Sequence, residues 1–295
     1  MIAAQPRPAA TFEEVPCPIC EAVSASPFLD GCRERLLELP DRFTLVRCDE
    51  CGLVRLNPRP TPESIGAYYP AEYLPFGADT LPRSSGLKRV VQSIFRRMYD
   101  WRYAGPPYEV TGAPGRRVVD VGCGTGWFLD QFAAQGWEAW GIELSLAAAS
   151  RARTRPGIQR VLAGAMEDAD LPEAYFDLVT FRDSIEHAFD PRLALTKAWR
   201  ALKPGGLIEL LTPDISSAEA RLFKQDWYAL ELPRHLQLFT PGTLARLLRE
   251  AGFEVVSWRP TPLPRGVHAS LDYALQSRFG LRIGTRQWRH MWLYY

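Results

Sequence analysis

The sequence lacks several features that would assign it to a class at once. No apolar run approaches the roughly 18 residues that a membrane span requires, and no signal-peptide segment lies near the N-terminus. We therefore expect a cytoplasmic protein without a transmembrane segment. An excess of one charge is also missing, because 35 basic and 34 acidic residues give a formal net charge of +1. Nucleic acid is accordingly not expected as the main partner.

Internal repeats and low-complexity tracts are absent as well. What is present is ample apolar material: hydrophobic residues make up 46% of the 295 residues. A chain of this length and composition can bury a sizeable core in one large globular domain or in two.

Cysteines are few, but four of the six occur in two C-x-x-C motifs about thirty residues apart. Each motif can present two thiolates to one ion, so Cys17, Cys20, Cys48 and Cys51 are predicted to bind zinc. A four-thiolate shell leaves no open coordination position, so this zinc would be structural. Disulfides or unpaired thiols are the alternative, and a cytoplasmic location disfavours disulfides. Residues Phe43 to Val46 predict a strand between the motifs, consistent with a zinc ribbon.

The stretch from Arg117 to Glu143 has the pattern strand, glycine turn, helix, strand. Glycines allow a sharp reversal and close approach of a ligand, and an acidic residue ending the second strand can accept both hydrogen bonds of a ribose diol. The dinucleotide pattern G-x-G-x-x-G is missing, because Trp127 occupies its third glycine position. A dinucleotide is therefore not expected. The glycines of the turn are Gly122, Gly124 and Gly126.

Strand-like and helix-like segments alternate through the second half of the chain. This alternation predicts an α/β fold with a doubly wound parallel sheet, which binds ligands beyond the carboxyl ends of its strands. The predicted strands are 117–121, 138–143, 160–163, 177–181, 206–212 and 253–259, and the predicted helices are 126–135, 145–154, 192–202 and 242–251.

The block VVDVGCGTG, followed by Glu143, resembles the cofactor loop of class I S-adenosylmethionine-dependent methyltransferases. Three further blocks typical of that family follow in order over about 150 residues: YFDLVTFRDSIEHAFDP, LKPGGLIELLTP and LFTPGTLARLLREAGFEV. Four ordered blocks are far more specific than one glycine motif. The resemblance implies a Rossmann-like methyltransferase sheet, S-adenosyl-L-methionine as the cofactor, and methyl transfer as the reaction.

The resemblance also assigns the cofactor contacts. The backbone of the glycine turn and Asp120 would border the methionine part, and Glu143 would hold the ribose. Relatives often place an aspartate for the adenine in the loop after the third strand, where this chain has Ala165. The backbone of Met166 and the carboxylate of Glu167 are therefore the predicted adenine contacts.

The candidate bases of the acceptor side are His187, in SIEHAFDP, and His235, in DWYALELPRHLQLFTPGTL. At neutral pH a neutral imidazole can remove a proton from the molecule that receives the methyl group. Some zinc-containing sugar C-methyltransferases are similar in having both histidines, but they carry Glu where this chain has Arg234. A helix cap for His187 and a backbone hydrogen bond for His235 are the structural alternatives. Further predicted pocket residues are Tyr68, Tyr69, Tyr73, Asp183, Trp227 and Tyr228.

We expect four parts of the chain: a zinc module at 1–60, linker and lid helices at 61–110, the methyltransferase domain at 111–260 and an extension at 261–295. The family's last antiparallel strand, after residue 259, is either degenerate here or follows Tyr295. Ser85 to Trp101 predict an amphipathic helix whose basic face is solvated or in weak contact with a membrane surface.

The expected function is methyl transfer to a small-molecule or glycan acceptor. An rRNA or tRNA methyltransferase is an alternative, because some of these enzymes carry an N-terminal four-cysteine module. The fourth strand ends in FRDSIEH, which differs from the N-P-P-Y type used on exocyclic base nitrogens. A cofactor-binding scaffold without catalysis is the third possibility. No pattern in the sequence identifies the acceptor atom or the oligomeric state.

Overall fold

The structure is a computed structural model, and it describes residues 10–35, 38–69, 115–260 and 264–281. The chain forms two compact units, each assembled from three segments. Unit 1 comprises residues 1–73, 183–199 and 211–283, and unit 2 comprises residues 74–182, 200–210 and 284–295. The four-part division at 60, 110 and 260 stays a prediction. Among the described residues, no helix combines the length and apolarity of a membrane span.

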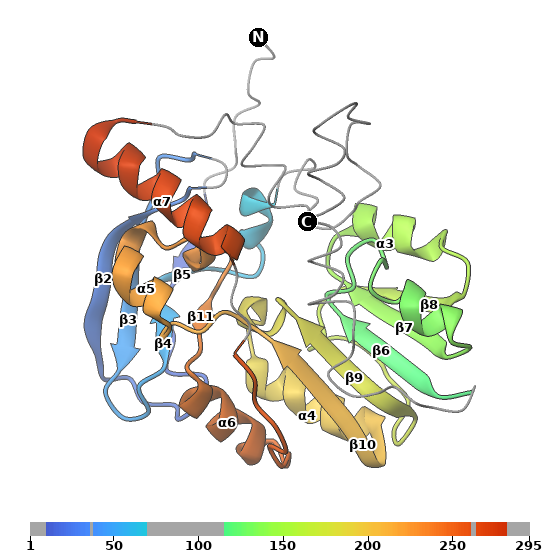
Figure 1. The fold of residues 1–295 in the computed structure, drawn as a ribbon. Coiled ribbons are helices and arrows are strands. Elements are labelled where there is room, and N and C mark those ends of the chain that lie inside the picture. The colour runs from blue at the N-terminus through green and yellow to red at the C-terminus, as the bar shows by residue number, and fades with distance from the viewer. Residues whose placement is uncertain (1–9, 36–37, 70–114, 261–263, 282–295) are drawn as a thin grey trace, which may run out of the picture. The chain divides into compact units, whose positions relative to one another are not determined.

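Unit 2 contains a five-stranded sheet with the order β10-β9-β6-β7-β8 (Figure 1). β6 pairs in parallel with both β7 and β9, and β7 pairs in parallel with β8. The predicted α/β class is therefore confirmed. The strands are β6 (Arg117–Val121), β7 (Glu138–Glu143), β8 (Ile158–Ala163), β9 (Phe176–Arg182) and β10 (Leu202–Leu211), and the helices are α2 (Asp130–Ala134) and α3 (Leu146–Arg153).

The core of unit 2 forms because β6 and β7 are apolar on both faces. Val118, Val119 and Ala139 have no exposed surface, and Val118 and Ala139 share a buried cluster with Leu129 and Phe132 from the segment around α2. α3 is capped by Ser145, whose side chain accepts a hydrogen bond from the backbone N–H of Ala148. This helix lies against β7 and β8 (Figure 1). Burial on both faces is typical of strands in a parallel sheet.

Unit 1 contains a four-stranded antiparallel sheet with the order β11-β4-β3-β2 (Figure 1). The strand predicted at Phe43 to Val46 is present within β3. The fourth strand of this sheet, β11, comes from a much later part of the chain. The strands are β2 (Ala25–Arg33), β3 (Arg42–Cys48), β4 (Val54–Leu56) and β11 (Gln237–Leu238), with β1 (Phe12–Glu13) paired to β5 (Arg59–Pro60) in a second, two-stranded sheet.

Unit 1 contains both short 3-10 turns and α-helices, and α4 extends from it into unit 2. α6 begins with a capping box between Thr240 and Thr243 and has a proline in its first turn. The helices are η1 (Ile65–Tyr68), η3 (Ile185–His187), α4 (Pro191–Ala201), α5 (Ala218–Phe223), η4 (Lys224–Asp226), η5 (Tyr228–Leu230), α6 (Pro241–Glu250) and α7 (Pro264–Phe279).

The strand predicted at 253–259 is wrong, because the structure has no strand there. Val256 and Trp258 are 68% and 59% exposed. An alternating pattern forms a strand only where a neighbouring strand accepts its backbone hydrogen bonds. α2 is also shorter than the predicted helix 126–135, since the residues after the glycine turn form turns first. The predicted helix from Ser85 to Trp101 lies outside the described residues.

Candidate functional site

The glycine turn of unit 2 lies between β6 and α2. Gly122, Gly124 and Gly126 have φ angles of +79°, +56° and +82°, a region that residues with a Cβ rarely adopt. The backbone N–H of Gly122 donates to the carbonyl of Ile142 at 2.8 Å, so the turn closes onto the end of β7. A Cβ on Gly126 would approach Ile158 Cδ1 to 2.6 Å. A side chain larger than hydrogen is therefore disfavoured at Gly126.

Glu143 braces the same turn from the end of β7. Its Oε2 accepts the backbone N–H of Gly124 at 2.8 Å, and its Oε1 accepts that of Ser145 at 2.7 Å. Burial nevertheless raises the pKa of this carboxyl group above its usual value. The backbone N–H of Leu144 also interacts with this carboxylate. A carboxylate can accept about four hydrogen bonds, so acceptor capacity is left for a ligand's hydroxyl group. The contact with Gly124 was not predicted, although the pairing of β6 with β7 brings the two residues together.

Asp120 lies in β6, directly before the turn, and is 3% exposed. Burial raises its pKa to about 7, although the hydroxyl of Thr180 donates to its Oδ1 at 2.6 Å. In the loop after β8, the Met166 side chain is buried and its carbonyl accepts the N–H of Ala169 at 3.2 Å. Glu167 is half-buried in the same loop. All the predicted cofactor residues thus lie in unit 2.

The four motif cysteines of unit 1 lie close together, and no cysteine of the chain forms a disulfide. Cys17 Sγ is 3.4 Å from Cys51 Sγ, and Cys20 Sγ is 3.4 Å from Cys48 Sγ. All four sulfur atoms lie within 4.8 Å of one another. Sulfur atoms around a tetrahedral zinc ion, with Zn–S bonds of about 2.3 Å, are separated by roughly 3.8 Å. The arrangement therefore suits one tetrahedral ion.

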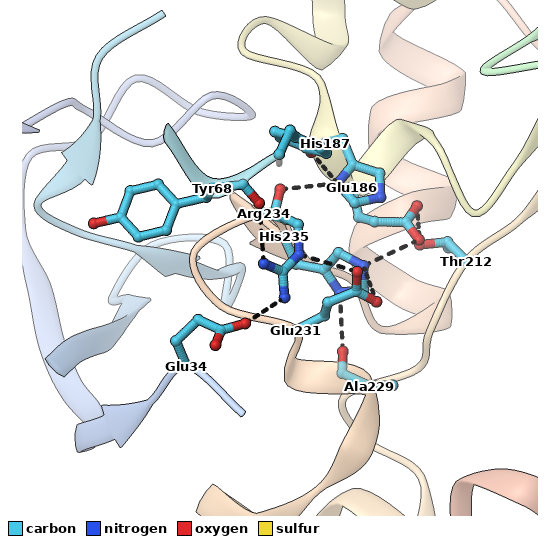
Figure 2. Close-up of polar contacts among 10 residues, drawn as sticks. Glu34, Tyr68, Glu186, His187, Thr212, Ala229, Glu231, Arg234 and His235 are labelled. Atoms are coloured by element: carbon cyan, nitrogen blue, oxygen red, sulfur yellow. Dashed lines mark hydrogen bonds and ion pairs between the residues drawn. The ribbon is translucent and has the colours of Figure 1, made fainter. Parts of the chain in front are cut away.

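His187 and His235 are in direct contact in unit 1 (Figure 2). Their ring centroids are 4.7 Å apart, and the rings meet at 69°. Nδ1 of His187 lies 2.9 Å from the carbonyl oxygen of Arg234, and Nδ1 of His235 lies 2.9 Å from that of Ala229. A carbonyl only accepts, so each Nδ1 carries the proton and each Nε2 of the neutral ring carries a lone pair. Burial lowers the pKa of both rings, for His235 to about 3.

Glu186 completes this group, and sequence reasoning missed it. Its side chain is fully buried, and its Oε2 accepts the hydroxyl of Thr212 at 2.9 Å (Figure 2). Its Oε1 has no hydrogen-bond partner among the described residues and lies 3.9 Å from Nε2 of His235. Burial raises the pKa of this carboxyl group well above its usual value, and the charge of Asp183 raises it further. In the sequence, the feature that could have identified Glu186 was its position directly before His187.

Arg234, which replaces the glutamate of the similar sugar enzymes, is buried beside the histidines. Its Nη2 donates to Glu34 Oε1 at 2.8 Å, and both side chains are 0% exposed. Its Nε donates to Glu231 Oε1 at 3.1 Å, and its Nη1 donates to the carbonyl of Tyr68 at 3.3 Å (Figure 2). Because its own carbonyl accepts the proton of His187, the arginine anchors the loop that holds both imidazoles.

The remaining predicted pocket residues lie in different surroundings within unit 1. Tyr69 places its hydroxyl 3.2 Å from Nδ1 of His187, and Asp183 adopts a positive φ of 51° shortly before Glu186. Tyr68 and Trp227 are buried in the core of the unit, and Tyr228 stacks on Tyr273. Tyr73 lies outside the described residues.

A family model for a methyltransferase domain matches residues 87–258, which is more than half of the chain. Among curated proteins, the ubiquinone biosynthesis O-methyltransferase of Thiobacillus denitrificans is 32% identical over 157 residues, which are 49% of this chain and 68% of that enzyme. The malonyl-[acyl-carrier protein] O-methyltransferase of Serratia marcescens is 28% identical over 133 residues, 45% of this chain. The chain covers only about half of the Serratia enzyme, 51% of its length.

Among solved structures, a methyltransferase from Thermotoga maritima, a possible histamine N-methyltransferase, is 28% identical with a TM-score of 0.42. The match covers 57% of this chain and 80% of that one. A methyltransferase of Haloferax volcanii, in complex with the activator Trm112, gives 20% identity and a TM-score of 0.46, with 58% and 76% of the two chains covered.

Proposed function

Because this chain belongs to the methyltransferase domain family, we propose that it transfers a methyl group from S-adenosylmethionine to an oxygen atom of a small-molecule or glycan acceptor. The activity follows from the family. The choice of oxygen is supported by the curated relatives from Thiobacillus and Serratia, which are O-methyltransferases. Bound S-adenosylmethionine supplies an electrophilic methyl group on a sulfonium, and the residues of the chain hold, orient and desolvate the reactants.

The observation that carries the cofactor half of the proposal is the bond between Glu143 and Gly124. It holds an acidic side chain at the glycine turn with acceptor positions to spare, which suits a ribose diol. Three glycines in the turn allow close approach of the methionine part to the backbone. We assign Asp120 to the amino-acid end of the cofactor, and the Met166 backbone and Glu167 to the adenine.

Calorimetry with S-adenosylhomocysteine tests this half. Glu143→Ala is expected to weaken binding by about 1–3 kcal/mol, or roughly 5- to 150-fold, because a charge-assisted contact and the brace of the turn are both lost. The matched control is Glu138→Ala, at the opposite end of the same strand, which should leave the affinity nearly unchanged. Tight binding of NADH without binding of S-adenosylhomocysteine would overturn the assignment.

For the acceptor half, we assign proton removal to the histidine pair. Each Nδ1–H is engaged by a backbone carbonyl, so each neutral ring offers Nε2 to a hydroxyl group. Loss of a general base typically slows turnover about 10²- to 10⁴-fold while sparing cofactor affinity. Transfer of labelled methyl groups to panels of phenols, sugars and RNA tests the acceptor class. Labelling of RNA alone would favour the rRNA or tRNA alternative, and labelling of none would favour the scaffold.

We further propose that Cys17, Cys20, Cys48 and Cys51 bind one structural zinc ion. Backbone N–H groups support one member of this donor set: burial disfavours the Cys48 thiolate, but the N–H groups of Cys51 and Glu50 lower its pKa to about 7. Burial raises the pKa of Cys17 and of Cys51, so a bound cation would have to stabilise those two thiolates. A closed four-thiolate shell would stabilise the loops between the strands of unit 1 without taking part in the reaction.

A further inference from the structure

We propose that Glu186, His187 and His235 form a second metal site, which binds a divalent transition-metal ion through two imidazoles and one carboxylate. Their ligand atoms lie within 4.8 Å of one another, and all three residues belong to unit 1. The proposed metal site is argued from geometry and does not depend on the proposed function. A catalytic role for the ion does rest on the proposed function.

The first support is the orientation of the two imidazoles. A histidine that binds a metal through Nε2 generally donates its Nδ1–H to a carbonyl or a carboxylate, which fixes the tautomer and the ring. Both rings already have this arrangement, with the carbonyls of Arg234 and Ala229 at 2.9 Å (Figure 2). Among the described residues, neither Nε2 has a hydrogen bond within normal distance. A lone pair on each ring is therefore available to a metal.

The second support is the unsatisfied carboxylate oxygen of Glu186. A buried oxygen without a partner costs about 1–3 kcal/mol, and more if it is charged. Oε1 of Glu186 is such an atom, while Oε2 is held by Thr212. No lysine or arginine forms an ion pair with this carboxylate among the described residues. A cation between Oε1 and the two Nε2 atoms would satisfy all three at once.

The third support is the spacing of the donors. Around a tetrahedral ion with bonds of about 2.0–2.2 Å, N and O ligands are roughly 3.3–3.6 Å apart. Nε2 of His235 is 3.9 Å from Glu186 Oε1 and 3.8 Å from Glu231 Oε2. These separations exceed the expected ligand spacing by a few tenths of an ångström. Glu231, which also pairs with Arg234, lies near the three ligands as an outer neighbour of the site.

The donor set indicates which ions fit. Two imidazoles with one carboxylate suit Zn²⁺, Fe²⁺ or Co²⁺, whereas Mg²⁺ prefers a shell of oxygen atoms. Three protein ligands leave a coordination position open, unlike the closed four-cysteine group. With an ion bound, both Nε2 lone pairs would be occupied, so the ion would take over the role that the proposed function gives to the histidine pair. An acceptor hydroxyl bound there would lose its proton to solvent more readily, since a metal lowers the pKa of a bound O–H group.

Metal stoichiometry of the full chain tests the site. After dialysis against Zn²⁺, elemental analysis should find two ions per chain, and Glu186→Gln or His235→Ala should leave one. Excess Mg²⁺ should not displace the second ion. The matched control is His268→Ala, an exposed histidine on α7, which should keep two ions. Thr212→Val, which removes only the support of Glu186, should weaken binding of the second ion about 10- to 100-fold.

Co²⁺ distinguishes the two groups by their spectra. Ions at the cysteines give thiolate-to-metal charge-transfer bands, whereas the second equivalent should add only ligand-field bands, which disappear in His235→Ala. If His235→Ala unfolds, His187→Gln at the half-buried ring takes its place in both measurements. A single ion in the parent protein, or a second ion that survives all cluster variants, would overturn the proposal. Calorimetry of S-adenosylhomocysteine binding to the same proteins distinguishes failure of this proposal from failure of the proposed function.

Discussion

The glycine turn of unit 2 and the Glu186–His187–His235 group of unit 1 are assembled in opposite ways. The turn, its brace Glu143 and the helix after it come from one continuous stretch, and parallel pairing of β6 with β7 brings them together. The histidine group joins the segment after β9 to a later loop, which is held by buried Arg234. A site made from one stretch is readable as a motif, whereas a site made from two requires the fold.

Two buried side chains, Arg234 of unit 1 and Asp120 of unit 2, differ in how their charge is held. In unit 1, Arg234 and Glu34 neutralise each other at 2.8 Å with no exposed surface. In unit 2, Asp120 is buried against a neutral hydroxyl, so its carboxyl group holds its proton more tightly than usual. Paired charge and protonated acid respond differently to mutation and to pH, which gives the following predictions.

The largest effect is expected for Cys48→Ser. Structural zinc contributes about 10–16 kcal/mol of apparent binding free energy in small zinc domains, and loss of one thiolate forfeits much of it. Elemental analysis should show loss of the cysteine-bound ion, and hydrogen exchange should show loss of protection in β2, β3 and β4 while β6 and β7 stay protected. Cys32→Ala, in β2 but outside the motifs, should keep the metal. Full protection of β3 in a metal-free variant would contradict the structural role.

Glu34→Gln should destabilise unit 1 by about 3–5 kcal/mol, because it leaves the buried guanidinium of Arg234 short of a charged partner. The free energy of opening of β11 and β4, from native-state hydrogen exchange, measures this loss. The double variant Glu34→Leu with Arg234→Met removes both charges and should cost less than the single variant. An equal or larger cost for the double variant would show that packing of the arginine, and not its charge, is what matters.

Asp120→Asn should flatten the pH dependence of unit 2. The native pKa of about 7 lies above the usual unfolded value of about 3.9, so the protonated native form contributes stability at low pH. That contribution, on the order of 2–4 kcal/mol, is lost as pH rises from about 4 to about 7. Hydrogen exchange of β6 amides between these pH values, corrected for intrinsic rates, measures the slope.

Asp177 provides a control of opposite sign in the same sheet. Burial alone would raise its pKa, but the hydrogen bond from Lys203 at 2.8 Å lowers it. Its contribution is therefore lost as pH falls through the folded value, and Asp177→Asn should leave the slope between pH 4 and 7 in place. Equal slopes in the parent protein and in Asp120→Asn would show that Asp120 is charged in the native state at neutral pH.

The smallest effect is expected for Thr240→Ala, which removes the cap of α6. The Thr240 side chain accepts the backbone N–H of Thr243 at 3.1 Å, and such caps contribute about 1 kcal/mol. Thr240→Ser keeps the acceptor and should recover most of the loss in a thermal unfolding series. A drop as large as that of Glu34→Gln would mean that the segment from β11 to α6 opens as one unit with the buried ion pair.

Local sequence alone predicted the features whose causes are local. The strands at 117–121 and 138–143 have the predicted bounds, because continuous apolar runs are typical of buried parallel strands. The glycines of the turn have the positive φ angles that their spacing requires. The cysteine motifs also meet as predicted, since each pair is placed by its own turn and the connecting chain forms a hairpin of strands.

Tertiary structure alone decided the features that depend on a distant partner. The segment 253–259 has a strand-like pattern but lacks a neighbouring strand, whereas the two residues of β11 form a strand because β4 accepts them. Glu186 lies beside His235 only because segments far apart in the chain pack together. The same is true of Arg234 and its partner Glu34. Periodicity and spacing in the sequence predict a residue's backbone conformation and the face of the helix or strand on which it lies. Burial, pairing of charges and assembly of a site depend on which distant residues the fold brings into contact.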